Sequence, residues 1–214
     1  MKTLTEFMKI DLNEFDLPTA RKIRDILDQN GVIIYPTDTI YGLGGNCFSL
    51  KVIKRIFKIK NRSRFKALAV VVSDLDMLNE IVRETPDSFE DLSKKFWPGA
   101  LTLILKAATH LPSDLLGPGG TIAVRQPGLD WLRRLIAYCG FPLISTSSNV
   151  SGKENIFNAE QAFGRFRGKV ELVIDGGKVP TALPSTIVDL TSPEPKIIRK
   201  GAVPAEKIIP YLQK

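Results

Sequence analysis

The chain alternates short runs of aliphatic and β-branched residues with longer segments in which apolar residues recur at helical spacing. This alternation restricts the fold, because strands and helices that follow one another along a chain pack as layers around a shared core. Several of the short runs, such as ALAVVV and LTLIL, are apolar almost throughout. Continuous apolar runs are typical of strands covered on both faces. We therefore predict an α/β protein with a mixed, mostly covered sheet.

Capping residues and glycines divide the chain into elements. Asp16 and Ser49 can cap helices at their amino ends, and Gly31 and Gly140 end the helices that precede them. Helices are expected at 16–30, 49–60, 74–82, 87–96, 130–139 and 158–166, and strands at 32–36, 67–72, 101–105, 121–125, 142–146, 170–175, 186–190 and 196–200. The glycine-rich stretch 37–45 is expected to be a loop. No linker interrupts the pattern, so we predict one domain over 1–214 with a motif-bearing core at about 16–203.

Composition excludes several classes of protein. The 214 residues are 43% hydrophobic and 25% charged, as in globular proteins rather than disordered or fibrous ones. No apolar run reaches the ~18 residues of a membrane-spanning helix, and no secretory signal is evident, so we expect a cytoplasmic protein without membrane contact. Cys47 and Cys139 lie far apart and are expected to be reduced, buried and inert. The single histidine, His110, excludes histidine-rich zinc sites.

Positive charge is concentrated in one segment. Residues 51–66 hold eight basic residues and no acidic one, and because the whole chain carries +7, the remainder is close to neutral. A cationic segment of this kind favours an anionic ligand. Its helical part presents four cations on the outer face, which we expect to be solvated: Lys51, Lys54, Arg55 and Lys58.

Polar clusters fall at the ends of predicted strands, where α/β proteins place their binding sites. They are Thr37 to Gly45, Lys60 to Lys66, Ser145 to Gly152, and Ser185 with Thr186. Arg125 and Arg199 each end a strand as well. Glycines let a ligand approach the backbone, hydroxyls donate to ligand oxygens, and guanidinium groups bind phosphate or carboxylate through two N–H groups. Because the chain has no GxxxxGK[ST] phosphate loop, an ATP site would need another cradle.

Six motifs follow one another in order: YPTDTIYGLG, Lys60-Asn61-Arg62 with Lys66, TIAVRQPG, STSSNVSG, PSTIVD and IIRKGAV. In this order and spacing, from about Val32 to Val203, the sequence resembles the YrdC-type threonylcarbamoyl-AMP synthases. The resemblance implies a twisted mixed α/β sheet flanked by helices around a basic concave cavity. It also implies a nucleotidyltransferase that forms threonylcarbamoyl-AMP and pyrophosphate from L-threonine, bicarbonate and ATP, for the threonylcarbamoyladenosine modification of tRNA. Longer members add a carboxyl-terminal domain, which this chain is expected to lack.

Carried over position by position, the resemblance assigns site residues to each substrate. Threonine would contact Thr39, Arg125, Ser147 and Ser185. ATP would contact Arg62, Lys66, Thr121, Asn149 and Arg199. Lys60 and Arg62 would be catalytic, beside the triphosphate. The chain departs from the family at Ala67 and at Phe157, where many members carry a hydroxyl near ATP, with Asn155 or Asn158 as substitutes.

The implied reaction depends on cations and positioning. A carboxylate oxygen of N-carboxythreonine attacks the α-phosphorus while pyrophosphate leaves, so negative charge builds on phosphate oxygens. We expect Mg²⁺ with ATP and downstream threonylcarbamoyl transferase proteins as partners, and a direct contact with tRNA stays open. Two alternatives stay open. One is a non-catalytic module that binds double-stranded RNA or tRNA through phosphate contacts. The other is a carbamoyltransferase domain that forms carbamoyl-adenylate, an activity expected of much longer chains.

Overall fold

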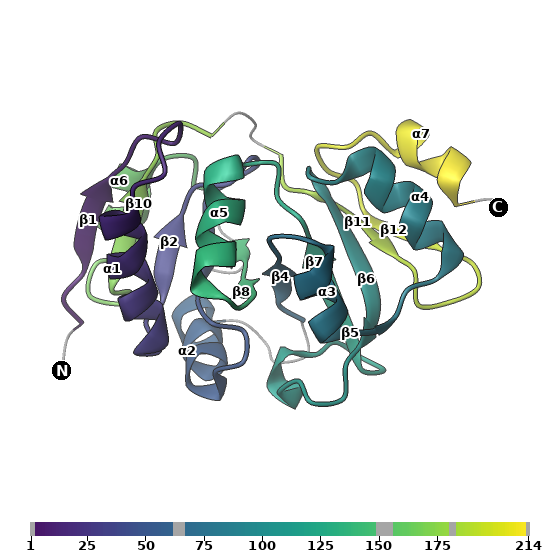
Figure 1. Cartoon of the computed structure of the whole chain (residues 1–214), viewed down its shortest axis with the longest axis horizontal. Helices are drawn as coiled ribbons and strands as arrows, with labels where there is room; N and C mark the ends of the chain where they lie inside the picture. The colour runs from purple at the N-terminus through teal and green to yellow at the C-terminus, as the bar shows by residue number, and fades with distance from the viewer. Residues whose placement is uncertain (1–2, 62–66, 149–155, 180–182, 213–214) are drawn as a thin grey trace.

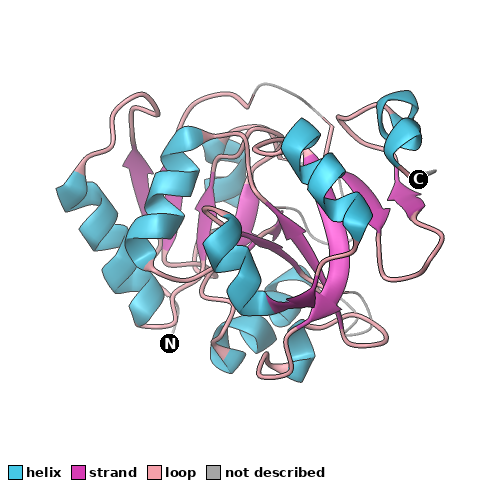
Figure 2. Cartoon of the chain, turned by 45° about the vertical axis from the view of Figure 1, so that its right-hand side comes forward, coloured by secondary structure: helices cyan, strands magenta, loops and turns pink. Residues whose placement is uncertain are grey.

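The computed structural model describes residues 3–61, 67–148, 156–179 and 183–212. Arg62, Lys66 and Asn149, three of the predicted site residues, lie outside these ranges, as does Asn155. In the described parts strands and helices alternate, and the predicted α/β class is confirmed. The strands lie side by side across the molecule with helices packed against them (Figure 1). Figure 2 shows that the strands twist relative to one another.

The first sheet has five strands, in the order β1 (Glu6–Lys9), β10 (Leu172–Asp175), β2 (Ile33–Tyr35), β3 (Gly42–Gly44) and β9 (Thr146–Ser147). Strands β1 and β2 run parallel to β10, whereas β3 runs antiparallel to both of its neighbours. Strand β1 was not predicted, because its residues are largely exposed and form no apolar run.

Strand β3 corrects the prediction of a loop over 37–45. Its Gly-Leu-Gly sequence lacks the side chains that favour strands, yet it pairs with β2 on one side and β9 on the other. A Cβ atom at Gly44 would stand 1.6 Å from the carbonyl oxygen of Ile144. The glycine therefore serves a close backbone approach between neighbouring segments rather than a turn.

The second sheet follows the order β12 (Lys196–Arg199), β11 (Thr186–Asp189), β6 (Leu101–Ala107), β7 (Thr121–Arg125), β4 (Ala69–Val71) and β8 (Leu143–Ile144), with β5 (Val82–Glu84) paired to β6. The pairs β11–β6 and β4–β7 are parallel, and the other pairs are antiparallel. The sheet is mixed, as predicted.

The prediction of one strand over 142–146 is wrong in an informative way. The segment divides at Ser145: β8 pairs with β4 in the second sheet, and β9 pairs with β3 in the first. At the division the Ser145 backbone N–H donates to the Ala69 carbonyl at 2.8 Å. This one segment therefore joins the two sheets edge to edge.

The helices are α1 (Leu17–Asp28), α2 (Leu50–Lys60), α3 (Leu75–Ile81), α4 (Asp87–Phe96), α5 (Asp130–Cys139), α6 (Ala159–Phe166) and α7 (Ala205–Ile208). Short 3₁₀ turns occupy Ser113–Leu115 and Ile209–Tyr211. The first six helices match the predicted ones within about two residues at each end, as expected of such boundaries. Asp16 caps α1 by accepting from the Thr19 N–H at 2.8 Å.

One of the four α2 cations that were predicted to be solvated is instead partly buried. Lys51, Lys54 and Lys58 are exposed, but the Arg55 side chain is only 28% exposed and its Nη1 lies 2.8 Å from the Glu171 carboxylate. Arg55 also donates to the Lys169 carbonyl at 2.7 Å. This ion pair ties α2 to the segment that enters β10, a contact between distant parts of the sequence that helical spacing alone does not reveal.

Both cysteines are buried and unbonded to each other, as predicted. Burial raises the pKa of each thiol above its ordinary value, that of Cys139 to about 12. Among the described residues, none of the helices combines the length and the apolar character needed to span a membrane.

Candidate functional site

A pocket of about 260 Å³ lies where the two sheets meet. The first sheet contributes Gly42 of β3 and Ser147 of β9, together with Tyr41, the residue before β3. The second sheet contributes residues of β4, β6, β7, β11 and β12. Because β8 and β9 carry the chain from one sheet to the other, the pocket is a consequence of that crossing.

The floor of the pocket is a face of the second sheet. Alternate residues of a strand face the same side, and both Ala123 and Arg125 of β7 line the pocket. Thr102 and Ile104 of β6 do the same. Ala69 pairs with Ala123 in the register, and that part of the floor is apolar. The neighbouring row, with Thr102 and Arg125, is polar. The floor therefore places a hydroxyl and a cation beside small methyl groups.

Arg125 is buried at one end of this floor, with 7% of its surface exposed. Its Nε donates to the Gly99 carbonyl at 2.7 Å, and its Nη1 donates to the Thr39 hydroxyl at 2.9 Å. Its Nη2 lies 2.5 Å from Oδ1 of Asp38. Burial lowers the pKa of Arg125, and the Asp38 carboxylate opposes this shift. Three anchors hold the guanidinium plane in one orientation, which is the arrangement that recognition of a planar carboxylate requires.

Thr37 orients Thr39. The Thr37 hydroxyl donates to the Ile40 carbonyl at 2.7 Å and accepts the Thr39 backbone N–H at 3.0 Å. Because the Thr37 hydroxyl already donates its single proton to the Ile40 carbonyl, Thr39 is the donor in the 3.1 Å contact between the two threonine hydroxyls. The Thr39 oxygen then accepts from Arg125. The threonine pair thus forms a directed chain that ends at the guanidinium.

Ser185 connects Thr102 of the pocket floor to Arg199. Its hydroxyl lies 2.7 Å from that of Thr102, and both side chains are buried. Arg199 donates from Nε and Nη2 to the Ser185 carbonyl at 3.1 and 2.8 Å, and Nη2 also reaches the Ser185 hydroxyl at 3.2 Å. A Cβ at Gly201 would stand 2.3 Å from the Pro184 carbonyl oxygen, so only glycine lets this backbone pass so close.

Lys60 is almost completely buried, with 1% of its surface exposed. Its ammonium group donates to the Ser147 carbonyl oxygen, and it has a further contact besides. Ser147 lines the pocket, whereas Lys60 is not among the described lining residues. In the described structure Lys60 therefore reaches the pocket through Ser147, and the sequence alone did not indicate this burial.

Tyr41 lines the pocket and ties a second segment to it. Its hydroxyl donates to the Gly177 carbonyl at 2.7 Å and accepts the Gly176 N–H at 3.2 Å. Burial raises the pKa of Tyr41 to about 12, so the phenol is neutral at physiological pH. The phenol thereby connects the residue before β3 to the turn that follows β10.

The structure brings together five of the predicted site residues as pocket lining: Thr39, Arg125, Ser147, Ser185 and Arg199. Thr121 is not among the lining residues, and its hydroxyl donates to the Pro118 carbonyl at 3.2 Å. Asn158, suggested as a substitute contact near Phe157, caps α6 by accepting from the Gln161 N–H at 2.9 Å.

Several polar lining residues had been given no individual role. Thr37, Tyr41, Ser145 and Thr146 lie within the predicted polar clusters, whereas Thr102 lies outside them. Thr102 carried a usable signal, since it is the single hydroxyl in the apolar run 101–105 and faces the same side as Ile104.

The described residues provide no group of three or more histidine, cysteine, aspartate or glutamate side chains that could hold a metal ion. The described lining of the pocket likewise includes no carboxylate. The described pocket therefore supplies guanidinium groups, hydroxyls and backbone groups, a set suited to anionic and hydroxylated ligands.

The geometry defines a class of protein: an α/β protein with two mixed sheets and a guanidinium-bearing pocket where the sheets meet. The chain belongs to the Sua5/YciO/YrdC family, whose model, described as "Telomere recombination", matches residues 25–201.

Named relatives agree with this assignment. The threonylcarbamoyl-AMP synthase of Pyrococcus abyssi is 36% identical over 177 residues, which are 83% of this chain and 52% of the relative. The threonylcarbamoyl-AMP synthase of Bacillus subtilis is 32% identical over 211 residues, 97% of this chain and 61% of the relative. The crystal structure of P. abyssi Sua5 complexed with L-threonine has a TM-score of 0.91 at 31% identity, covering 99% of this chain and 61% of that one. The chain thus spans about half to three-fifths of these relatives' length.

Proposed function

We propose that this domain forms threonylcarbamoyl-AMP and pyrophosphate from L-threonine, bicarbonate and ATP. The observation that carries the proposal is one pocket with an oriented guanidinium at each end, Arg125 beside Thr39 and Arg199 beside Ser185. Joining an amino acid to a nucleotide requires a carboxylate site and a phosphate site within reach of one another. The names of the relatives, and the threonine complex of one of them, support the same activity.

In this proposal the ends of the pocket have different tasks. Arg125 and Thr39 bind the threonine carboxylate, and Ser147 and Ser185 complete the amino-acid site. Arg199 binds phosphate oxygens. The family resemblance adds Arg62, Lys66, Thr121 and Asn149 on the nucleotide side, of which Thr121 alone lies in the described part of the chain.

The reaction needs charge stabilisation more than a protein nucleophile. Attack of the carbamate oxygen on the α-phosphorus moves negative charge onto phosphate oxygens and the leaving pyrophosphate. A guanidinium held in place before the reaction stabilises that charge without reorganisation. Lys60, through the Ser147 carbonyl, fixes the strand that borders this space. Because the described lining carries no carboxylate, we expect Mg²⁺ to enter with the triphosphate as part of the substrate.

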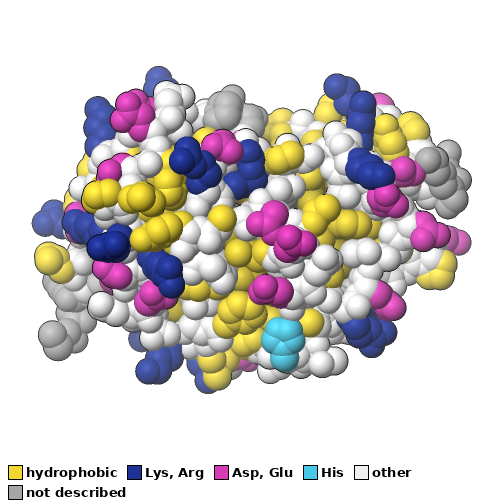
Figure 3. Space-filling model, viewed as in Figure 1, with side chains coloured by type: hydrophobic (Ala, Val, Ile, Leu, Met, Phe, Trp, Pro, Cys, Tyr) yellow, Lys and Arg dark blue, Asp and Glu magenta, His cyan; other side chains and the backbone are white. Residues whose placement is uncertain are grey.

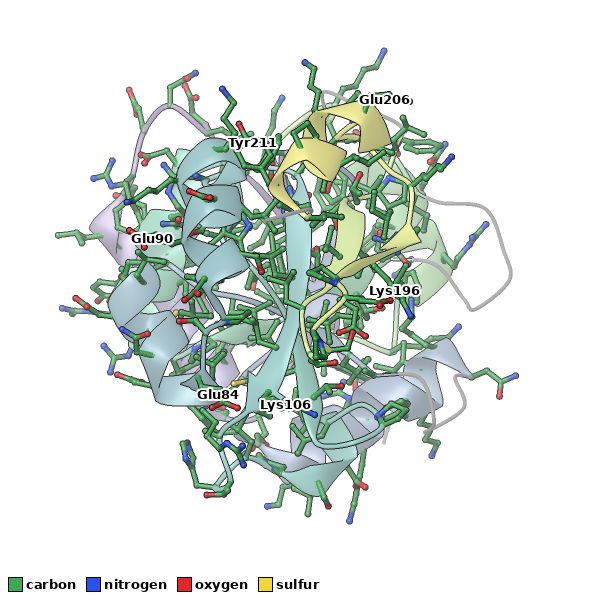
Figure 4. All side chains as sticks on the ribbon, turned by 90° about the vertical axis from the view of Figure 1, so that its right-hand side faces the viewer. Glu84, Glu90, Lys106, Lys196, Glu206 and Tyr211 are labelled. Atoms are coloured by element: carbon green, nitrogen blue, oxygen red, sulfur yellow. The ribbon has the colours of Figure 1, made fainter. Side chains whose placement is uncertain are left out.

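The RNA-binding alternative predicts a broad surface of one charge. On the face shown in Figure 3, lysine and arginine side chains are interspersed with aspartate and glutamate. On the side shown in Figure 4, Glu84 lies beside Lys106, its partner in the register of β5 and β6. Mixed charge of this kind on two faces favours recognition in the pocket over phosphate contacts across these surfaces. The proposal includes two kinds of partner: downstream threonylcarbamoyl transferase proteins, which would take up the product, and tRNA.

Pyrophosphate release tests the proposal. The protein is incubated with ATP and Mg²⁺, and release is measured with and without L-threonine and bicarbonate. Release should require both, and mass spectrometry should detect threonylcarbamoyl-AMP. Release with carbamoyl phosphate in place of the two substrates would instead support the carbamoyl-adenylate alternative. Retention of tRNA without any release would support the RNA-binding one.

A matched pair of serine variants tests the site. Ser185→Ala removes the hydroxyl that contacts Thr102 and Arg199. Ser192→Ala removes an exposed hydroxyl that donates to the nearby Glu194 carbonyl. Losing one oriented donor at a reacting centre costs about a hundredfold in turnover. The turnover of Ser185→Ala should therefore fall by up to about a hundredfold, while that of Ser192→Ala stays near wild type. Equal activity of the two variants would contradict the assigned pocket.

A further inference from the structure

The Arg125 end of the pocket contains a buried ion pair. Arg125 Nη2 and Asp38 Oδ1 are 2.5 Å apart, with side-chain exposures of 8% and 18%. Asp38 lies between the lining residues Thr37 and Thr39 in the sequence, yet the family resemblance assigned it no role. Since the two charges cancel, the pair has no net charge although it contains a guanidinium.

Arg125 and Asp38 are in direct contact as an ion pair. Both the Asp38 Oδ1 and the Arg125 Nη2 atoms are buried, and neither has a hydrogen-bond partner of good geometry. The carboxylate is packed from the other side by Gly128, where a Cβ would stand 2.7 Å from Oδ2. The absence of a side chain at Gly128 thus allows the carboxylate to lie against Arg125.

An isolated guanidinium in such a site would accept any small anion, including phosphate. With Asp38 beside it, an added carboxylate leaves the site with one uncompensated negative charge, which is costly in a buried environment. A zwitterion brings a positive ammonium group with its carboxylate and leaves the site neutral. The pairing therefore favours a ligand with both charges over an anion of the same shape.

We propose that Asp38 is a specificity-determining residue that makes the Arg125 end of the pocket accept a zwitterionic α-amino acid and reject singly charged analogues and phosphate. This inference rests on the proposed function, because it concerns how the same pocket selects its amino acid. Asp38 acts through Arg125 and through its charge.

Binding to the wild-type protein gives the first test. Calorimetry would compare L-threonine with 2,3-dihydroxybutanoate of matching configuration, which has a hydroxyl in place of the amine, and with threoninamide, which lacks the carboxylate. Each analogue should bind at least about tenfold more weakly than threonine, because each adds an uncompensated charge. Equal affinity of threonine and the hydroxy acid would overturn the inference.

The variant Asp38→Asn assigns the effect to the residue. The amide keeps the shape and removes the charge, so the preference for threonine over the hydroxy acid should shrink toward one, and pyrophosphate should begin to compete with threonine. A structural role alone would weaken both ligands equally and leave the ratio unchanged, which would also overturn the inference. Asp76→Asn, an exposed acid at the start of α3, is the matched control and should keep the wild-type ratio.

Because removing one partner of a buried ion pair can unfold a protein, a second variant keeps the test decisive. Gly128→Ala retains both charges but places a methyl group against the Asp38 carboxylate. This variant should still melt cooperatively and should show a smaller preference for threonine over the hydroxy acid. An unchanged preference would argue against a role of Asp38 in specificity. If wild-type protein bound no threonine at all, the proposed function itself would fail. Binding of threonine without discrimination would refute the inference alone.

Discussion

Thr186 organises the backbone beneath the Ser185 end of the pocket. Its side chain is fully buried, and its hydroxyl donates to the Val203 carbonyl at 2.6 Å. The same oxygen accepts the N–H groups of Gly201 and Val203 at 3.0 and 3.2 Å. One hydroxyl therefore holds the segment that follows β12, and β12 carries Arg199. Replacing Thr186 by valine keeps the shape of the side chain and removes all three bonds.

The expected cost follows from these contacts. A buried polar group left without a partner costs about 1–3 kcal/mol, and two donors and one acceptor would lose theirs. Gly201 and Val203 are half-buried, so water can partly replace the lost bonds, and we expect a total of about 3 kcal/mol. For a chain of this length each kcal/mol lowers the melting temperature by about 2–4 °C, which gives a decrease of roughly 6–12 °C.

Calorimetric melting and denaturant titration would measure the change. Thr186→Ser keeps the hydroxyl and should lose only about 1 kcal/mol for the missing methyl group. Thr191→Val removes a half-buried hydroxyl with a side-chain bond to Asp189, and it should cost less than about 1 kcal/mol. A Thr186→Val protein that melted within about 2 °C of wild type would show that the three bonds do not stabilise this segment.

Three further predictions concern packing, a buried cation and a thiol. Gly44→Ala should fail to fold or melt far below wild type because its Cβ would meet a carbonyl oxygen at 1.6 Å, whereas Gly164→Ala, in open space within α6, should gain up to about 1 kcal/mol in a thermal melt. Lys60→Met should weaken threonine binding measured by calorimetry and also lower the rate of pyrophosphate release, because the ammonium group holds Ser147, which the proposal places in the amino-acid site. Cys139, whose pKa burial raises to about 12, has almost no thiolate at pH 8 in the folded protein and should react with a thiol reagent only after unfolding; fast labelling of the native protein would contradict its burial.

Local signals predicted the helices well. Helix α5 spans the predicted residues 130–139, and Gly140 adopts the left-handed conformation that ends it. Asp16, Ser49 and Asp74 each cap a helix through their side chains. These features depend on residues within one turn of each other, so the sequence contains all the information that they need.

The misplaced elements depend on distant partners. Nothing within residues 142–147 reveals that the strand divides, because the division is set by β4 on one side and β3 on the other. Strand β3 is stabilised by its two neighbours despite its glycines. The ion pair of Arg55 joins residues far apart in the chain. The motifs did bring five predicted residues to one pocket, since strand ends in a shared sheet lie close together.

The sheet also sets the separation between the two ends of the pocket. Ile187 pairs with both Arg199 and Thr102, and because Leu103 pairs with Val124, Arg125 comes next to Thr102 in the same row. Three strand-to-strand steps at about 4.8 Å separate the backbones of the two arginines, or roughly 14 Å. Both side chains line one pocket. Asp38 pairs with Arg125, whereas the Ser185 carbonyl and hydroxyl orient Arg199. The row therefore keeps the charge-balanced Arg125, proposed for the amino acid, apart from Arg199, proposed for phosphate, and the Ser185 hydroxyl contacts Thr102 and Arg199 between them.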